Sequence, residues 1–238
     1  MSEQVQLGDM TIEVVRKDIK NVHLSVHPPT GKVRIAAPSR MNLETLRVFA
    51  IAKLSWIHDQ QRKLQEQARE TPREYLDRES HYVWGQRTLL TLVEAEQPPS
   101  VEVSHSRLIL TMRPGSEPSK REAILEDWYR EQLRAAIPSL LEKWEHLLGV
   151  KVERIFVQHM KTKWGSCNPA SRTIRLNTDL AKKPRECLEY ILVHELIHLL
   201  EPTHNARFVA LLSQFMPKWE SNRETLNRMP VRHERWGY

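Results

Sequence analysis

Two histidines and a glutamate lie within five consecutive residues, in the segment HELIH from His194 to His198. At 3.6 residues per turn, a spacing of four puts both imidazoles on one face of a helix, about one turn apart. Imidazoles placed in this way can hold one metal ion, and Glu195 beside them can accept a proton from water. The segment therefore predicts the metal site of a zinc-dependent hydrolase, with Glu195 as the general base.

A catalytic zinc site takes three protein ligands and leaves one position open. His204 is the first candidate for the third ligand, because Pro202 stops the helix and lets the chain turn back toward the metal. A carboxylate from a following helix, Glu220 or Glu224, is the alternative. The chain has 11 histidines, so HExxH by itself can arise by chance. A further histidine just behind a proline makes chance a poorer explanation.

Helical periodicity surrounds this segment. Pro184 is a good first residue for a helix through ECLEYILVHELIHLL, and Pro202 ends it. A second helix is expected from about residue 204, with one apolar face made of Phe208, Leu211, Leu212 and Phe215.

A longer helical pattern lies upstream, over residues 121–149. Pro138 is expected to kink or break it, and Gly149 to end it. This pattern predicts a long helix with its apolar residues at helical spacing.

The segment KWGSCNPASRTIRLN, residues 163–177, predicts a strand end, a tight turn and a return strand. Gly165 is expected to take a positive φ in the turn. The return strand RTIRLN alternates apolar and polar residues, and it is expected to be an edge to which an extended substrate adds as another strand. Four residues near this turn are candidates for substrate or transition-state contacts: His159, Lys163, Arg175 and Asn177.

The first part of the chain is expected to be rich in β-strands. Residues 1–40 predict a small antiparallel meander, and Asn42 is expected to cap one long helix of about eight turns. Further short strands follow. The stretch RPGSEPSK sets a domain boundary near residue 115, between an N-terminal β-rich region with a long helix, 1–115, and a hydrolase core, 116–238. The fold class is α+β.

Basic residues are concentrated in one window. The chain has a formal net charge of +6, and residues 151–185 hold nine basic and two acidic residues, so the rest of the chain sums to −1. The window predicts either a solvated rim or an electropositive wall beside the metal site.

The remaining composition indicates a cytoplasmic protein. No run approaches the roughly 18 apolar residues that span a bilayer, and the N-terminus lacks the pattern of a signal peptide. Two cysteines, Cys167 and Cys187, are too few for a disulfide framework and suit a reducing compartment. We expect both to be free thiols.

Several of these segments together resemble a known family. They are WGSC at 164–167, the strand IRLN, the segment YILVHELIHLLEPTHNARF at 190–208, and an N-terminal third with VRKDIKNVHLSVHPPTGKVRIAAPSR. The chain resembles the YgjP-like metallohydrolases, which are allied by motif to the SprT-type and WLM zinc proteases. The resemblance implies a zincin-like core with His194, His198 and His204 as zinc ligands and Glu195 as the base.

Three functions remain open at this point. A metallopeptidase that acts on peptides or proteins is favoured by the HExxH helix and the expected edge strand. The family also carries a nucleoside-triphosphate pyrophosphatase label with UTP as the nucleotide, and the basic window favours this alternative, although no glycine-rich phosphate cradle is present. A nucleic-acid-associated zinc protease module is the third, and it lacks a recognisable reading motif.

Overall fold

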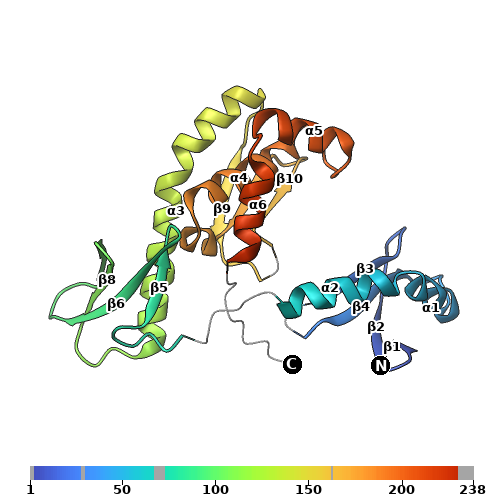
Figure 1. Ribbon diagram of the computed structural model, residues 1–238, viewed down its shortest axis with the longest axis horizontal. Helices are drawn as coiled ribbons and strands as arrows, with labels where there is room; N and C mark the ends of the chain where they lie inside the picture. The colour runs from blue at the N-terminus through green and yellow to red at the C-terminus, as the bar shows by residue number, and fades with distance from the viewer. Residues whose placement is uncertain (1–2, 28–29, 67–72, 162, 230–238) are drawn as a thin grey trace. The chain divides into compact units, whose positions relative to one another are not determined.

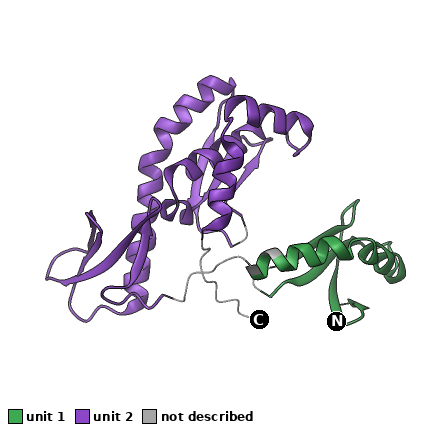
Figure 2. Ribbon diagram, in the orientation of Figure 1, with its two compact units in different colours: residues 1–69, 233–238 green, residues 70–232 purple. Residues whose placement is uncertain are grey.

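A computed structural model describes residues 3–27, 30–66, 73–161 and 163–229. The chain divides into two compact units, residues 1–69 with 233–238, and residues 70–232 (Figure 2). Each unit has its own hydrophobic core. Both units combine helices with a sheet, so the predicted α+β class is confirmed (Figure 1). Among the described residues, no helix is long and apolar enough to cross a membrane.

Unit 1 holds a four-stranded sheet made of β1 (Glu3–Leu7), β2 (Met10–Lys17), β3 (His23–His27) and β4 (Lys32–Pro38). The order is β1-β2-β4-β3, and the central pair β2–β4 is parallel. The expected antiparallel meander is therefore wrong at its centre. The parallel pair holds most of the buried side chains of this sheet, Ile12, Val14, Val33 and Ile35 among them, and central parallel strands are typically the most buried.

The expected long helix of unit 1 is two helices, α1 (Leu43–Ile51) and α2 (Leu54–Glu66). Asn42 caps α1 as predicted, since its side chain accepts a hydrogen bond from the Thr45 backbone N–H at 2.8 Å. No glycine or proline marks the break. A straight helix of this length, about 36 Å, would extend well past a four-stranded sheet. Because the chain breaks between α1 and α2, both helices can pack on this sheet. Ile57 of α2 is fully buried in the same core as Leu46 of α1.

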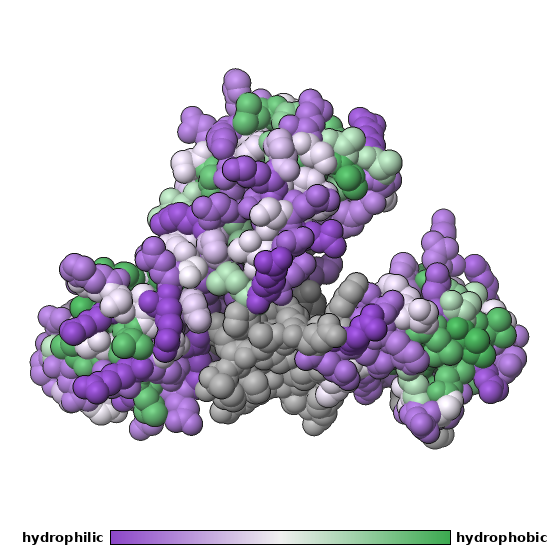
Figure 3. Space-filling model, in the orientation of Figure 1, coloured by the Kyte–Doolittle hydropathy of each residue, from purple (hydrophilic) through white to green (hydrophobic). Residues whose placement is uncertain are grey.

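The visible face of unit 1 carries a concentration of apolar residues (Figure 3). The exposed large apolar residues of its helices are Leu43, Val48, Ile51 and Trp56. A shallow hollow borders this region, between the turn of the β1–β2 hairpin and the two helices.

Unit 2 begins with a second four-stranded sheet, made of β5 (Ser80–Val83), β6 (Gln86–Glu94), β7 (Ser100–Ser104) and β8 (Arg107–Met112). Its order is β5-β6-β8-β7. The turn between β5 and β6 docks on the segment before α4 (Arg185–Ile197). Trp84 N donates to the Ala181 carbonyl at 2.8 Å, and Gly85 N donates to the Lys182 carbonyl at 3.2 Å. This sheet therefore belongs to the same unit as the motif-bearing helix.

The compact units do not divide near residue 115, where a domain boundary was expected. The unit that contains the HELIH helix starts at residue 70 and includes the β5–β8 sheet. The division into domains 1–115 and 116–238 stays a prediction.

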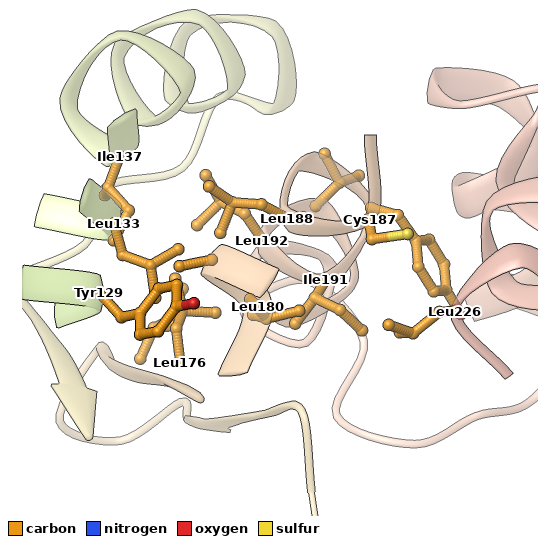
Figure 4. Close-up of a cluster of buried hydrophobic side chains, with 14 of the residues drawn as sticks. Tyr129, Leu133, Ile137, Leu176, Leu180, Cys187, Leu188, Ile191, Leu192 and Leu226 are labelled. Carbon is orange, nitrogen blue, oxygen red and sulfur yellow. The ribbon is translucent and has the colours of Figure 1, made fainter. Parts of the chain in front are cut away.

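The supporting helix α3 runs from Pro118 to Leu148, and Gly149 ends it with a φ of 65°. The break expected at Pro138 is absent, since the helix continues through it. Pro138 is exposed, so water can satisfy the carbonyl that the proline leaves without a donor. Side chains of α3, such as Leu133 and Ile137, point toward the buried face of α4 (Figure 4).

A three-stranded sheet lies beside α4. It consists of β9 (Arg154–Gln158), β10 (Gly165–Asn168) and β11 (Thr173–Asn177), in the order β10-β11-β9. The strand RTIRLN was expected at the edge, but β11 is the middle strand, with β10 antiparallel on one side and β9 parallel on the other. The edge strand next to α4 is β10. Alternation of apolar and polar residues reports which face is buried and says nothing of lateral partners.

Helix α4 is the centre of the unit 2 core. Nine of its thirteen residues are buried, and it packs against α3, the β10–β11 hairpin, α5 (Ala206–Phe215) and α6 (Trp219–Arg228). Before α4 comes the short 3-10 helix η1 (Thr178–Lys182), which α3 also contacts. This burial fixes the direction in which the HELIH face points.

Candidate metal centre

Three imidazoles converge where α4 ends. His194 lies in the last turn of α4, His198 is its C-cap, and His204 lies in the turn just before α5. The three can each offer one ring nitrogen so that these atoms lie within 4.8 Å of one another. Nε2 of His204 lies 2.9 Å from Nε2 of His194.

The reversal of the chain between the two helices has identifiable causes. After α4 the backbone tightens, with Leu200 N and Glu201 N both donating to the Ile197 carbonyl at 2.9 and 2.8 Å. Asn205 then caps α5, because its side chain accepts from Phe208 N at 3.0 Å. His204 sits between these two features, immediately before the cap, and so faces back toward α4.

The tautomer of His198 is set by the same turn. Its Nδ1 lies 3.1 Å from the carbonyl oxygen of Glu201, which can only accept, so Nδ1 carries the proton and Nε2 keeps its lone pair. Hydrogen bonds of this kind orient metal-binding histidines. Nδ1 of His194 is buried and has no hydrogen-bond partner within the described residues.

Phe208 forms a common apolar contact for the three rings. Its ring centroid lies 4.9, 4.7 and 4.8 Å from those of His194, His198 and His204. Phe208 is almost fully buried, so it fixes the imidazoles from one side. Helical periodicity places Phe208 on an apolar helix face and does not predict its contact with the three histidines. Its position four residues after His204 was the only available signal.

Burial keeps two of the imidazoles neutral. It is the main cause that lowers the pKa of His194 to about 4, with smaller effects from His198, His204 and Arg223. Burial also lowers the pKa of His198. A neutral imidazole has the free lone pair that a metal ligand needs, so protons do not compete for these nitrogens at neutral pH.

Glu195 is buried on the side of α4 that faces β10. Its side chain lies against Gly165, and the residue is 5% exposed. Burial raises the pKa of Glu195 to about 7, and the positive charge of Lys163 opposes this effect. A carboxyl group with this pKa can both accept and release a proton near neutral pH.

Of the four expected contact residues, Lys163 is the one whose charge affects the pKa of Glu195, and it lowers that pKa. Asn177 is buried and has a structural role. Its side-chain amide donates to the carbonyls of Met160 and Lys163 at 2.7 and 2.9 Å, which ties down the loop that leads into β10.

The other two expected contacts lie elsewhere on the sheet. Arg175 alternates with Ile174 and Leu176 along β11, so it projects from the sheet face opposite to the one that Gly165 presents to Glu195. There it lies over the ring of Phe156, at 5.8 Å from its centroid. His159 is exposed just after β9, the strand on the other side of the sheet from β10. The structure therefore does not bring Arg175 to the site, and a role for His159 stays a prediction.

The carboxylate alternative for the third ligand lies on α6. Glu220 and Glu224 are both exposed, and Glu224 Oε2 pairs with Arg228 at 3.0 Å. Among the described residues, the group with converging ligand atoms contains the three histidines and neither carboxylate.

The basic window does not form a continuous wall. Lys182 and Lys183 are buried, and Lys182 pairs with Asp179 at 2.6 Å and with Glu126 at 3.6 Å. Lys151 pairs with Glu145 at 2.6 Å, and Arg185 stacks on Trp84 at 4.1 Å. Several of the charges that suggested an anionic substrate therefore serve the fold.

The family model for the YgjP-like metallopeptidase domain matches residues 20–229 of this chain. The chain belongs to the YgjP-like family. It is therefore a metal-dependent hydrolase of the peptidase class, as the resemblance in WGSC, IRLN and HELIH implied. The match spans both compact units and is not confined to the unit that carries the three histidines.

Two solved structures are similar to part of this YgjP-like chain. The metallopeptidase zymogen abylysin of Pyrococcus abyssi is 22% identical, with a TM-score of 0.35, over 40% of this chain and 97% of that one. The metallopeptidase zymogen jannalysin of Methanocaldococcus jannaschii is 24% identical, with a TM-score of 0.35, over 38% of this chain and 86% of that one. No curated protein matched the chain.

Proposed function

We propose that this protein is a zinc-dependent peptidase in which His194, His198 and His204 hold the metal and Glu195 is the general base. The observation that carries the proposal is the convergence of three imidazole nitrogens within 4.8 Å, at the end of the helix that also carries a buried glutamate. Membership of a metallopeptidase family supports the same reading.

The donor set suits zinc. Three imidazoles with a fourth position left open are typical of catalytic zinc sites. In a tetrahedral site with Zn–N bonds of about 2.0–2.1 Å, two ligand nitrogens lie about 3.3 Å apart. The Nε2 atoms of His194 and His204 lie 2.9 Å apart, and the three ligand nitrogens lie within 4.8 Å of one another, so side-chain adjustment at the histidines would bring them to this spacing.

Zinc at this position would supply Lewis-acid chemistry, since it lowers the pKa of water and polarises a carbonyl group. Glu195 takes the proton from the attacking water and can later release it to the leaving amine. Its burial supports both steps, because a pKa of about 7 leaves the ionised and protonated forms close in energy. His198, held by the Glu201 carbonyl, and the contact with Phe208 keep the imidazoles oriented.

We further propose that an extended peptide adds to β10 and not to β11. Asn177 N donates to the Trp164 carbonyl at 2.9 Å, so residues 164 and 177 form a hydrogen-bonded pair of the antiparallel ladder. Such pairs alternate, so the backbone groups of Ser166 point toward β11 and those of Gly165 and Cys167 point outward. Outward groups of an edge strand can bind a peptide backbone. They lie on the strand that faces Glu195.

The main support for the nucleotide alternative was the basic window, residues 151–185. Several of its basic side chains are paired within the fold, which removes this support. Lys182, Lys183 and Arg185 are engaged within the fold, and Arg175 lies on the far face of the sheet. Within the described residues, no observation favours triphosphate binding or a nucleic-acid partner over a peptide substrate.

A substrate panel tests the proposed function. Zinc-loaded protein is offered unstructured proteins, extended peptides, UTP and the other nucleoside triphosphates, each with and without a chelator. We expect cleavage of polypeptides alone, lost on chelation and restored by zinc. Release of pyrophosphate without any peptide cleavage would establish the alternative and refute the proposal.

A further inference from the structure

Gly165 of β10 lies in direct contact with the side chain of Glu195. A Cβ atom built on Gly165 would be 2.7 Å from Oε1 and 2.9 Å from Cγ of Glu195, and 2.9 Å from Cγ2 of Ile191. Unbonded carbon atoms pack at about 3.5–4.0 Å. The strand therefore approaches α4 so closely here that no side chain can be accommodated without movement.

The reason for glycine at this position is steric, not conformational. The positive φ that the sequence suggested for Gly165 is absent. Gly8, Gly115 and Gly149 show the opposite case, since each has a positive φ and open space around it. Glycine inside a strand, without a positive φ, commonly marks a close approach of the backbone to another group.

The contact has a clear direction. The three nearest atoms to the built Cβ belong to Glu195 and Ile191, and none belongs to a histidine. The end of the glutamate side chain is flexible, whereas Ile191 lies in the packed core of α4. A methyl group on residue 165 would therefore displace the side chain of Glu195 and press on Ile191, and its three nearest contacts would not include an imidazole.

Neighbouring residues show that this face of the strand looks toward the carboxylate. Cys167 lies two residues further along β10, on the same face as Gly165. Burial, and secondly the charge of Glu195, raise the pKa of the Cys167 thiol to about 11. Lys163, two residues before Gly165, acts electrostatically on Glu195.

We propose that Gly165 is a positioning residue: the lack of a side chain at this point of β10 holds the Glu195 carboxylate in the orientation that accepts the proton from water. The inference rests on the proposed role of Glu195 as general base. It adds that β10 both binds the substrate backbone and forms the wall that orients the base. One strand thus sets the distance between the substrate and the base.

The test is Gly165→Ala in the full-length, zinc-loaded protein. We expect kcat for a peptide substrate to fall at least tenfold, with KM within threefold of wild type and with zinc content unchanged. The d–d spectrum of cobalt-substituted protein should also be unchanged, because the ligands are not displaced. Ser166→Ala is the matched control, since this neighbouring side chain projects from the other face of the strand. We expect the control to keep wild-type kcat.

A double variant separates positioning from other effects. Adding Gly165→Ala to Glu195→Gln should lower the residual activity by less than threefold, because a residue that acts through Glu195 has nothing left to act on. A full multiplicative loss would overturn the inference, as would a Gly165→Ala protein that loses zinc, fails to fold, or keeps full activity. If Glu195→Gln itself stays active, the proposed function fails. If Glu195→Gln is inactive while Gly165→Ala is fully active, only the inference about Gly165 fails.

Discussion

Nε2 of His204 lies 2.9 Å from Nε2 of His194, although the two are ten positions apart in the chain, with the end of a helix between them. The turn that brings them together also supplies the Glu201 carbonyl that orients His198. A short irregular segment therefore completes a site that a helix alone can only half provide. Its local hydrogen bonds, and not a rigid element, decide where the third imidazole lies.

Replacing His204 with alanine should weaken zinc binding. The variant keeps only two of the three protein ligands. We therefore expect zinc to be lost to a chelator at least ten times faster, with peptidase activity lost in parallel. Zinc release is measured with a colorimetric chelator. His146→Ala, an exposed histidine near the end of α3, is the control that should keep the metal. If Glu224→Gln loses zinc and His204→Ala does not, the ligand assignment is wrong.

Glu195→Gln should keep the metal and lose turnover. Glutamine has nearly the same shape but cannot accept the proton, so kcat should fall by about 10²–10⁴-fold, the usual contribution of a general base. Zinc content and melting temperature should stay near those of the wild type. Measurable wild-type turnover in a variant with full zinc content would remove Glu195 from the mechanism.

Proline substitutions in β10 should distinguish its two edges. Cys167→Pro removes an N–H that points outward, so we expect KM for peptides to rise several-fold while the fold persists. Ser166→Pro removes an N–H that points toward β11, so it should instead lower the melting temperature. Cys167→Ala controls for the loss of the thiol. Equal effects of the two proline variants on KM would contradict substrate binding at this edge.

Removing the metal should stop the chemistry without unfolding the chain. The core of unit 2 is large and apolar without counting the metal site, and metal is not needed to bury it. Protein treated with a chelator should therefore keep its far-UV circular dichroism spectrum and lose peptidase activity. Its melting temperature should fall, because a ligand that binds only the folded state stabilises it by an amount that grows with the logarithm of ligand concentration over Kd. Unfolding on chelation would show that the metal is structural.

His81 should make the stability of the protein depend on pH. Burial, with the charges of Arg73 and Lys182, lowers its pKa from the usual 6.5 to about 3. Glu79 Oε1 lies 3.3 Å from Nε2, but Nε2 makes no hydrogen bond within the described residues, so we expect burial to dominate. Between these two pKa values the imidazole is protonated in the unfolded chain and neutral in the folded one. The free energy of unfolding therefore decreases as the pH falls from about 6.5 toward 3.

The size of this effect can be measured by difference. Between pH 7 and pH 5, the wild type should lose about 2 kcal/mol more free energy of unfolding than His81→Phe, which cannot be protonated. Urea unfolding at the two pH values measures it. Identical pH dependence in both proteins would mean that Glu79 stabilises the protonated imidazole enough to offset burial.

The local sequence was sufficient to predict the site's components. A spacing of four places His194 and His198 on one helix face, Pro202 predicts the turn, and Asn42 and Gly149 mark a helix start and a helix end. These features depend on contacts within a few residues, so they can be read from the chain directly. The structure agrees on the histidine pair, on Asn42 and on Gly149, whereas α4 ends at Ile197, several residues before Pro202.

Tertiary structure decided what lies beside these components. The sequence placed RTIRLN at a sheet edge and gave Gly165 a turn conformation, whereas β11 is central and Gly165 is a close-contact position. Backbone hydrogen bonds between strands are the same for every residue type, so lateral order is set by packing of the whole unit. Basic residues of the 151–185 window likewise pair with acidic residues that are distant in sequence, as Lys182 does with Glu126. Residue types and spacing determined the chemistry available to this protein, and packing determined which strand, ring and charge surround it.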